Sequence, residues 1–212
     1  MLHLQIFTFN VASENTYLLY NDENNAWLFD PGNMNEKETS TLENFISEKN
    51  LTITNILLTH AHLDHVFGLQ WAFDTYKIPV KMHKEDQEVL DMFPMSASRF
   101  GVLVQPIKVE TQYISEGDIL NFDGEEFKIF HVPGHSPGSI VFYNEKQNFM
   151  ISGDVLFEGS IGRTDLYKGD YELLIDGIKK KLLPLPGNTQ VFSGHGNSTT
   201  IEFEKNYNPF LK

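Results

Sequence analysis

Cysteine is missing from this sequence of 212 residues. Disulfide bonds, a cysteine nucleophile and metal sites built on thiolates are therefore excluded. If the protein binds a transition metal, histidine and carboxylate side chains must hold it.

Basic residues are scarce. Sixteen Lys and Arg stand against 29 Asp and Glu, which gives a net charge of −13 and a pI near 4.9. Such a surface repels nucleic acid backbones and anionic membranes over roughly one Debye length, about 8–10 Å at physiological salt. We therefore expect neither nucleic acid nor a membrane as a partner, and the oligomeric state is left open.

Long apolar runs are also missing. No stretch approaches the roughly 20 apolar residues that cross a bilayer, and no basic region precedes an apolar one near Met1. We expect a cytoplasmic protein. Its hydrophobic content of 41% and its 17 Phe can supply the core of a single domain over residues 1–212.

Apolar patterns predict short strands and helices in both halves of the chain. Strands are expected at Leu2–Phe9, Tyr17–Tyr20, Ala26–Phe29, Ile53–Thr59, Val80–His83, Ile119–Phe122, Phe127–Val132, Ser139–Tyr143, Phe149–Ser152 and Gln190–Ser193. Helices are expected at Glu36–Lys49, Val66–Tyr76, Lys84–Asp91 and Tyr171–Leu183. Met92–Pro106 has no clear period and is predicted to be a loop, a candidate cover for a site. This pattern indicates an α/β (α+β) fold with one shared core.

The segment His60-Ala-His-Leu-Asp-His65 directly follows an apolar strand. Residues two apart in an extended chain point to the same side, so His60 and His62 can reach one ion. Where the chain turns into a helix, Asp64 and His65 can face a second ion. The alternative is a polar helix start with Asp64 acting on the helix dipole, but capping does not explain three His in one loop.

Three further candidates share one context: each follows an apolar strand and has glycine beside it. They are His135 in Gly-His-Ser-Pro-Gly, Asp154 in Ser-Gly-Asp and His195 in Ser-Gly-His-Gly. Strand ends hold side chains rigidly, and small neighbours let the backbone approach an ion. A lone His in a turn is more often an ordinary polar residue. With the first motif, however, these residues provide five His and two Asp, which is enough for two ions.

This ordered set of motifs resembles the metallo-β-lactamase-fold hydrolases, and among them the small glyoxalase II-like (hydroxyacylglutathione hydrolase-like) proteins. The resemblance covers residues 30 to 196. The tail from Gly194 to Leu211, which ends in Tyr-Asn-Pro-Phe-Leu, also resembles the short form of that subfamily. It implies an αββα four-layer sandwich with a dinuclear metal site at one sheet edge. It also implies a single domain that lacks the C-terminal helical glutathione-binding domain of full-length glyoxalase II.

The resemblance implies a ligand set for two divalent metal ions. It assigns one metal to His60, His62 and His135, the other to Asp64, His65 and His195, and the bridging position to Asp154. Zn²⁺ is the first expectation for both ions, with Fe or Mn as alternatives.

Other residues receive supporting roles. Arg163 stands where glyoxalase II enzymes have a substrate-binding Lys, and Asp165 replaces a Tyr, so Arg163 is expected to bind substrate or, alternatively, to pair with Asp165. Asp30 is expected either to accept a proton from a ligand His or to form a turn. His3, His83 and His131 match no ligand position and are assigned to structure, His131 as a support for the turn of His135.

The implied activity is hydrolysis of a small-molecule thioester such as S-lactoylglutathione, or of a related ester. In this hypothesis the metals lower the pKa of a shared water from about 15.7 toward about 7, and the bridging hydroxide, oriented by Asp64 and Asp154, attacks the carbonyl. The two carboxylates do not neutralise two divalent ions, so an anionic or carbonyl substrate is favoured. A thiolate then leaves without a strong general acid.

Three alternatives stay open. A persulfide dioxygenase would hold a single Fe(II) with His60, His135 and Asp154, a facial-triad ligand set. A lactonase or another ester hydrolase of the same fold would use the same metals. A metal-binding module without catalysis is the third alternative, although all seven ligands are present. A β-lactamase is disfavoured, because the bridging Asp154 belongs by resemblance to the glyoxalase II-like pattern.

Overall fold

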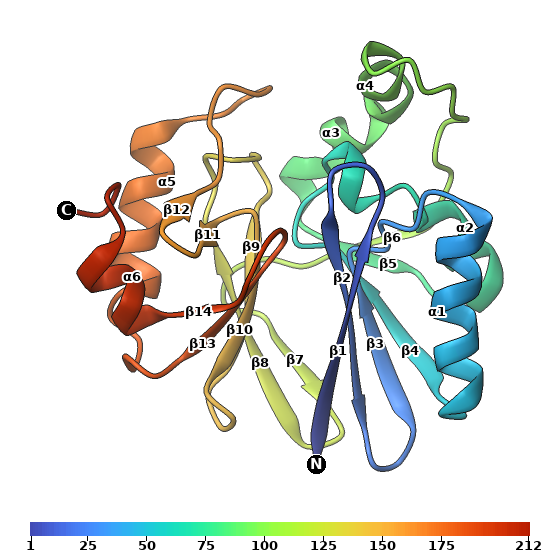
Figure 1. Cartoon of the computed structure of the whole chain (residues 1–212), viewed down its shortest axis with the longest axis horizontal. Coiled ribbons are helices and arrows are strands. Elements are labelled where there is room, and N and C mark those ends of the chain that lie inside the picture. Colours follow the sequence, from blue (N-terminus) through green and yellow to red (C-terminus); the bar gives the residue numbers. More distant parts are fainter. The chain divides into compact units, whose positions relative to one another are not determined.

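The computed structural model describes all 212 residues, which form two compact units. Unit 1 comprises Met1–Met82 and Gln87–Tyr113, and unit 2 comprises His83–Asp86 and Ile114–Lys212. Each unit contains one six-stranded sheet (Figure 1). No helix is long and apolar enough to cross a membrane. The single domain and the cytoplasmic location expected from the sequence stay predictions.

The sheet of unit 1 follows the order of the chain. Its strands are β1 (Leu2–Phe9), β2 (Glu14–Asn21), β3 (Asn25–Phe29), β4 (Thr52–Leu57), β5 (Val80–Met82) and β6 (Thr111–Tyr113). The pairs β1–β2 and β2–β3 are antiparallel, and the pairs from β3 to β6 are parallel. Because β3 and β4 are parallel, their carboxyl ends meet at one edge, and this brings the residues after β3 beside those after β4.

Helices of unit 1 lie between the parallel strands in sequence: α1 (Glu36–Glu48), α2 (Leu69–Tyr76), α3 (Gln87–Asp91) and α4 (Phe93–Arg99). The side chain of Asn35 caps α1 by accepting a hydrogen bond from the backbone N–H of Glu38. Leu42 and Ile46, one turn apart, are the buried residues of α1 and belong to the core of the unit.

The sheet of unit 2 has the order β14-β13-β10-β9-β8-β7. These strands are β7 (Ile119–Phe122), β8 (Glu125–His131), β9 (Ile140–Asn144), β10 (Phe149–Gly153), β13 (Gln190–Ser193) and β14 (Thr199–Thr200). A separate hairpin consists of β11 (Leu156–Phe157) and β12 (Ser160–Ile161). β10 and β13 are parallel, so the residues after β10 and those after β13 lie at the same edge.

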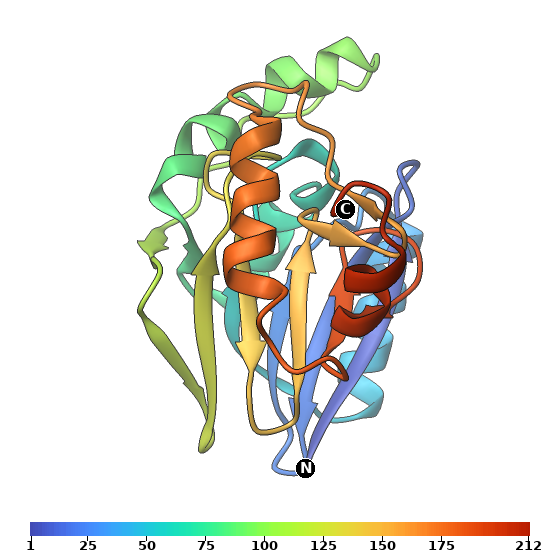
Figure 2. The same ribbon diagram turned by 90° about the vertical axis from the view of Figure 1, so that its left-hand side faces the viewer.

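Two helical segments cover the sheet of unit 2 (Figure 2). α5 (Tyr171–Gly177) continues as a π-helical segment over Ile178–Leu182, and α6 (Ile201–Tyr207) follows β14 directly. Leu174 and Ile178 pack into the same apolar core as Val141 and Met150 of the sheet. The helices therefore cover one face of the sheet, and polar residues follow the ends of its strands.

The prediction of a loop over Met92–Pro106 was wrong for its first half. Residues Phe93–Arg99 form α4, with Pro94 in its first turn and Phe93 and Ala97 buried four residues apart. Proline suits the first turn of a helix because the backbone N–H that it lacks has no partner there. A helix of 7 residues with only two buried positions is too short to show a helical period in the sequence.

Candidate metal centre

In unit 1 the side chain of Asp30 organises the candidate ligands after β4. Asp30 follows β3, has a φ of 47°, and is buried. Its Oδ1 accepts from the backbone N–H of Thr59 at 2.7 Å, and its Oδ2 accepts from the Thr59 hydroxyl at 2.6 Å and from His65 Nδ1 at 3.1 Å. Asp tolerates this left-handed conformation better than most residues. One carboxylate therefore joins the end of β3 to both ends of the histidine motif.

These hydrogen bonds decide which nitrogen carries the proton on two imidazoles. The carboxylate of Asp30 can only accept, so His65 must be protonated on Nδ1. The Thr59 hydroxyl gives its hydrogen to Asp30 and therefore accepts from His60 Nδ1, 3.0 Å away. Both rings keep the lone pair of Nε2 for another partner, which is the tautomer a metal ligand needs.

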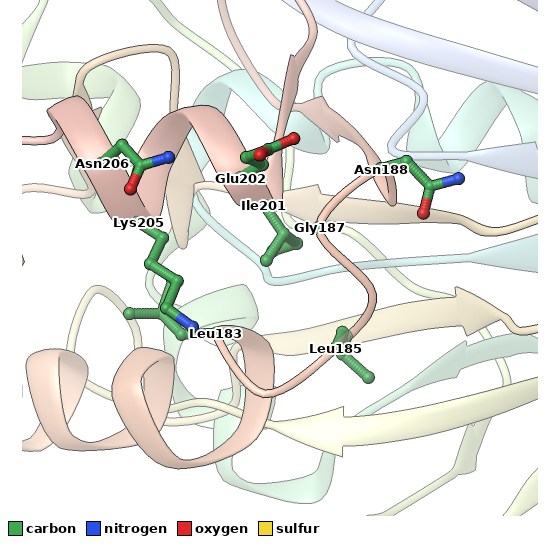
Figure 3. Close-up of a pocket in the computed structure, with 8 residues that line it drawn as sticks. All are labelled: Leu183, Leu185, Gly187, Asn188, Ile201, Glu202, Lys205 and Asn206. Carbon is green, nitrogen blue, oxygen red and sulfur yellow. The ribbon is translucent and has the colours of Figure 1, made fainter.

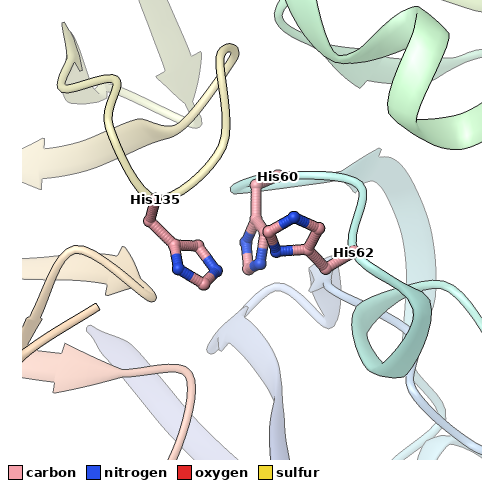
Figure 4. Close-up of side chains that lie close together, drawn as sticks. All are labelled: His60, His62 and His135. Carbon is pink, nitrogen blue, oxygen red and sulfur yellow. The ribbon is translucent and has the colours of Figure 1, made fainter. Parts of the chain in front are cut away.

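The other two residues of the motif lie beside these rings. Figure 4 shows the rings of His60 and His62 on the segment after β4, and their centroids are 4.8 Å apart with the planes at 88°. Asp64 Oδ2 lies 3.9 Å from His65 Nε2. The Nδ2 of Asn10 donates to the backbone carbonyl of Asp64 at 2.9 Å, which fixes the turn that presents Asp64.

Glu14, at the start of β2, is a residue of this cluster that the sequence reasoning missed. It is fully buried, and its Oε1 lies 3.9 Å from His65 Nδ1. Burial raises the pKa of Glu14 well above its usual range, because its carboxyl group is removed from water. No local pattern around Glu14 indicates this role, since the contact joins residues 51 positions apart (65 − 14).

In unit 2 the three remaining candidate ligands converge. Asp154 Oδ2 lies 3.4 Å from His135 Nε2 and 3.5 Å from His195 Nε2. The parallel pairing of β10 and β13 produces this arrangement, with Gly194 N donating to Gly153 O at 2.9 Å at the ends of the two strands. Two atoms that bind one tetrahedral ion at about 2.1 Å lie about 3.4 Å apart, so this spacing fits ligands that share ions.

His135 lies on the loop after β8 (Figure 4) and has its proton placed by the backbone. Its Nδ1 is 2.8 Å from the carbonyl oxygen of Arg163, which can only accept. The Nδ1 of His135 therefore carries the proton, and Nε2, the atom that faces Asp154, carries the lone pair of the neutral ring. Gly162 makes this contact feasible, because a Cβ there would lie 1.9 Å from the carbonyl oxygen of Asp154.

A second buried carboxylate, that of Asp86, holds the loop of His135. Asp86 Oδ1 accepts from the Ser136 hydroxyl and from the backbone N–H of Gly138, both at 2.5 Å. A Cβ on Gly138 would lie 2.7 Å from the backbone nitrogen of Asp86. The sequence reasoning placed Asp86 in an acidic helix and missed this role. The Gly-His-Ser-Pro-Gly turn was the available signal, because its second glycine marks a close approach.

His83 and His131 support the same loop. Their rings stack with centroids 3.9 Å apart, and His131 Nε2 lies 2.8 Å from the carbonyl oxygen of Pro137. Burial and the neighbouring His131 lower the pKa of His83, which favours its neutral form. His3 lies elsewhere, in unit 1, where its Nε2 is 2.7 Å from Asp22 Oδ1.

The side chain of Arg163 forms a bidentate ion pair with Asp165, with N···O distances of 2.7 and 2.8 Å. The guanidinium group lowers the pKa of Asp165 to about 2. Both side chains are more than half exposed, at 62% and 69%, so water screens the pair and a competing carboxylate has access to Arg163.

A surface cavity of about 490 Å³ in unit 2 is formed by other residues (Figure 3). Leu183, Leu185 and Ile201 provide its apolar part, and Glu202 and Lys205 of α6 contribute charge. None of the candidate ligands lines it. The candidate chemistry of unit 2 therefore does not depend on this cavity.

Comparison with known proteins identifies the family. The model of the metallo-beta-lactamase superfamily matches residues 10–195. The chain belongs to the metallo-β-lactamase superfamily. The Haemophilus influenzae protein "Hydroxyacylglutathione hydrolase GloC" is 38% identical over 212 residues, which cover 99% of this chain and 98% of the relative. The residues matched by the family model include all seven candidate ligand positions, from His60 to His195.

Two solved structures of this superfamily are similar over nearly the full length. "BLEG-1 B3 metallo-beta-lactamase" has a TM-score of 0.91 at 40% identity and covers 99% of this chain and 100% of its own. "TTHA1623 in a di-iron-bound form" has a TM-score of 0.87 at 35% identity, with 98% and 100% covered. The predicted fold class is thereby confirmed, and the protein is a metallo-hydrolase of the metallo-β-lactamase fold.

Replacement of Asp86 tests whether its carboxylate holds the loop of His135. Asp86→Ala leaves the Ser136 hydroxyl and the Gly138 N–H buried without their acceptor, so we expect the free energy of unfolding to fall by about 2–4 kcal/mol. Asp86→Asn keeps Oδ1 and should lose less. Urea denaturation followed by circular dichroism measures both, with the exposed Asp91→Ala as control. A midpoint for Asp86→Ala equal to that of Asp91→Ala would contradict this assignment.

Proposed function

We propose that this protein is a dinuclear metal-dependent hydrolase that cleaves a thioester of the S-lactoylglutathione type or a related ester. The observation that carries the proposal is the convergence of His135 and His195 on one oxygen of Asp154, at distances typical of ligands that share ions. The similarity to the Haemophilus influenzae hydroxyacylglutathione hydrolase supports the thioester as the substrate class.

The ligands divide into two sets that share Asp154. One ion would be bound by His60, His62 and His135, and the other by Asp64, His65 and His195. The donor chemistry fits such ions, because imidazole and carboxylate groups suit Zn²⁺, Fe and Mn. The tautomers of His60, His65 and His135 support it further, since in each neutral ring the proton is on Nδ1 and the lone pair on Nε2.

When bound, two divalent ions supply Lewis acidity that lowers the pKa of a shared water and polarises a substrate carbonyl. The carboxylates of Asp64 and Asp154 orient the attacking water by accepting its hydrogen bonds. Asp30 keeps His65 from rotating. A thiolate leaving group, with a pKa near 8.5, needs no strong general acid, and the site accordingly requires none from this chain.

The identity of the metal is the finer part of the proposal. Zn²⁺ is our first choice because it prefers histidine and carboxylate ligands in this type of site. The similar structure of TTHA1623 is described in a di-iron-bound form, which makes Fe the second choice. A mononuclear Fe(II) persulfide dioxygenase would need only His60, His135 and Asp154 and would leave four candidate ligands without a role.

Hydrolysis of β-lactams is a second candidate function. The similarity to the structure of BLEG-1 B3 metallo-beta-lactamase, at 40% identity, favours testing it. A β-lactam and a thioester both present a carbonyl carbon to the attacking water. They differ in the leaving group, since a β-lactam nitrogen must be protonated and a thiolate need not be.

Metal analysis together with a substrate panel tests the proposal. We expect about two equivalents of Zn, Fe or Mn per chain, as the seven ligands require. We also expect hydrolysis of S-lactoylglutathione to be faster than that of a lactone or a β-lactam. The measurements are elemental analysis and absorbance assays on one preparation. One Fe per chain with rapid O₂ uptake in the presence of a persulfide would replace the hydrolase by the dioxygenase.

His135→Ala should remove most thioesterase activity, more than about 100-fold, and should lower the metal content, because an imidazole that binds the first metal is lost. Circular dichroism should show a folded protein. His3→Ala, which removes a partly exposed His outside the candidate ligand set, is the matched control. Hydrolysis of S-lactoylglutathione by His135→Ala at the parent rate would show that the ligand assignment is wrong.

Arg163→Ala should raise KM roughly 10- to 150-fold for substrates whose leaving group carries a carboxylate, because a charge-assisted contact is lost. Neutral thioesters should be affected much less. Asp165→Asn releases Arg163 from its ion pair and should leave KM for the charged substrates unchanged or lower. If both variants instead lower the melting temperature and slow both classes of substrate equally, the ion pair only fixes the loop.

A further inference from the structure

The carboxyl group of Glu204 in α6 is fully buried, and it touches none of the candidate ligands. It accepts hydrogen bonds from three elements of unit 2. The Thr199 hydroxyl donates at 2.6 Å, Asn208 Nδ2 at 2.7 Å, and the backbone N–H of Gly159 lies 3.1 and 3.2 Å from the two carboxyl oxygens. A buried carboxyl group with this many donors fixes the positions of all of them.

Two of these donors lie on segments that carry candidate ligands. Thr199 begins β14, four residues after His195. Gly159 forms the turn of the β11–β12 hairpin with a φ of 67°, a conformation that favours glycine. The chain enters this hairpin from Asp154 and leaves it toward Arg163.

Asn208 belongs to the C-terminal Tyr-Asn-Pro-Phe-Leu tail, for which the proposed function gives no role. Its Nδ2 donates to the carbonyl oxygen of Ser160 at 2.9 Å as well as to Glu204. Asn208 is buried, with 1% of the residue exposed. The tail therefore holds the second strand of the hairpin while Glu204 holds the turn.

The hairpin reaches all three candidate ligands of unit 2. Beyond β12, Gly162 passes against the backbone of Asp154, and the next carbonyl oxygen, that of Arg163, accepts from His135 Nδ1. On the other side the ring of Phe157 contacts the ring of His195, with centroids 6.3 Å apart. A displacement of the hairpin would thus remove the acceptor that fixes the tautomer of His135.

We propose that Glu204 is a positioning residue, which through Gly159 and Thr199 holds the β11–β12 hairpin and the His195 loop so that His135, Asp154 and His195 converge on their ions. The inference deepens the proposed function and rests on it for the identity of the ligands. Glu204 and Asn208 together form a clamp on the hairpin. Neither residue contacts substrate or metal, so both act through the backbone of the segments that they hold.

A series of variants separates positioning from plain stability. Glu204→Ala removes the acceptor. Glu204→Gln keeps one oxygen for Asn208 and Gly159, and its amide group can donate to Thr199, so it should act as the conservative rescue. Glu202→Ala, an exposed change on the same helix, is the matched control. Two readouts follow: the tautomer of His135 by ¹⁵N NMR of histidine-labelled, metal-free protein, and Zn²⁺ affinity by competition with a chromogenic chelator.

For Glu204→Ala, we expect His135 to change from the single Nδ1-protonated form to a mixture, and the Kd for Zn²⁺ to rise about 10- to 100-fold. Glu204→Gln and Glu202→Ala should match the parent in both readouts. A purely structural role would lower the melting temperature of Glu204→Ala while leaving the tautomer and the Zn²⁺ affinity at the parent values, and that outcome overturns the proposal.

Two milder variants keep the test decisive if Glu204→Ala does not fold. Asn208→Ala releases β12 and should disturb His135, whereas Thr199→Val releases only the His195 loop and should weaken Zn²⁺ binding with the His135 tautomer intact. If both variants match the parent in the His135 tautomer and in Zn²⁺ affinity, the proposed clamp is overturned. If the parent itself binds none of Zn²⁺, Fe²⁺ and Mn²⁺, the proposed function fails, but the tautomer in metal-free protein still decides whether Glu204 positions His135.

Discussion

An imidazole binds a metal through one nitrogen only when the other nitrogen carries the proton. In this protein three histidines satisfy that condition through three different acceptors: the hydroxyl of Thr59, the carboxylate of Asp30 and the carbonyl of Arg163. Each acceptor is fixed in turn, since Thr59 donates to Asp30 and the backbone of Arg163 follows a hairpin. The orientation of each of these candidate ligands therefore depends on the neighbouring group that accepts from its Nδ1.

The parallel strand pairs explain why polar residues far apart in the sequence lie beside one another. In unit 1 the pair β3–β4 brings Asp30 next to Thr59, and in unit 2 the pair β10–β13 brings Asp154 next to His195. In both units, polar residues therefore lie just beyond the neighbouring carboxyl ends of two parallel strands. The buried carboxylates of Asp30, Asp86 and Glu204 tie the loops to their surroundings, and each accepts from several donors.

The sequence predicted what local patterns determine. Apolar patterns in both halves indicated the α/β (α+β) class. The histidine motif after β4 and the glycine-flanked polar residues after later strands supplied the candidate ligands. Asp86 and Glu204 were missed because their importance comes from partners 50 and 45 positions away. An acidic residue that is buried cannot be told from an exposed one by its neighbours in sequence. The helix at Phe93–Arg99 was missed because it is too short to show a period.

Arg163 contributes to this protein in two independent ways. Its carbonyl oxygen accepts from His135, and its side chain reaches the exposed carboxylate of Asp165. Every amino acid supplies that carbonyl, so evolution can exchange the side chain at position 163 without releasing the imidazole. A substitution at position 163 therefore changes what the loop presents to solvent while the imidazole of His135 stays held, so the two roles of this one residue can vary independently.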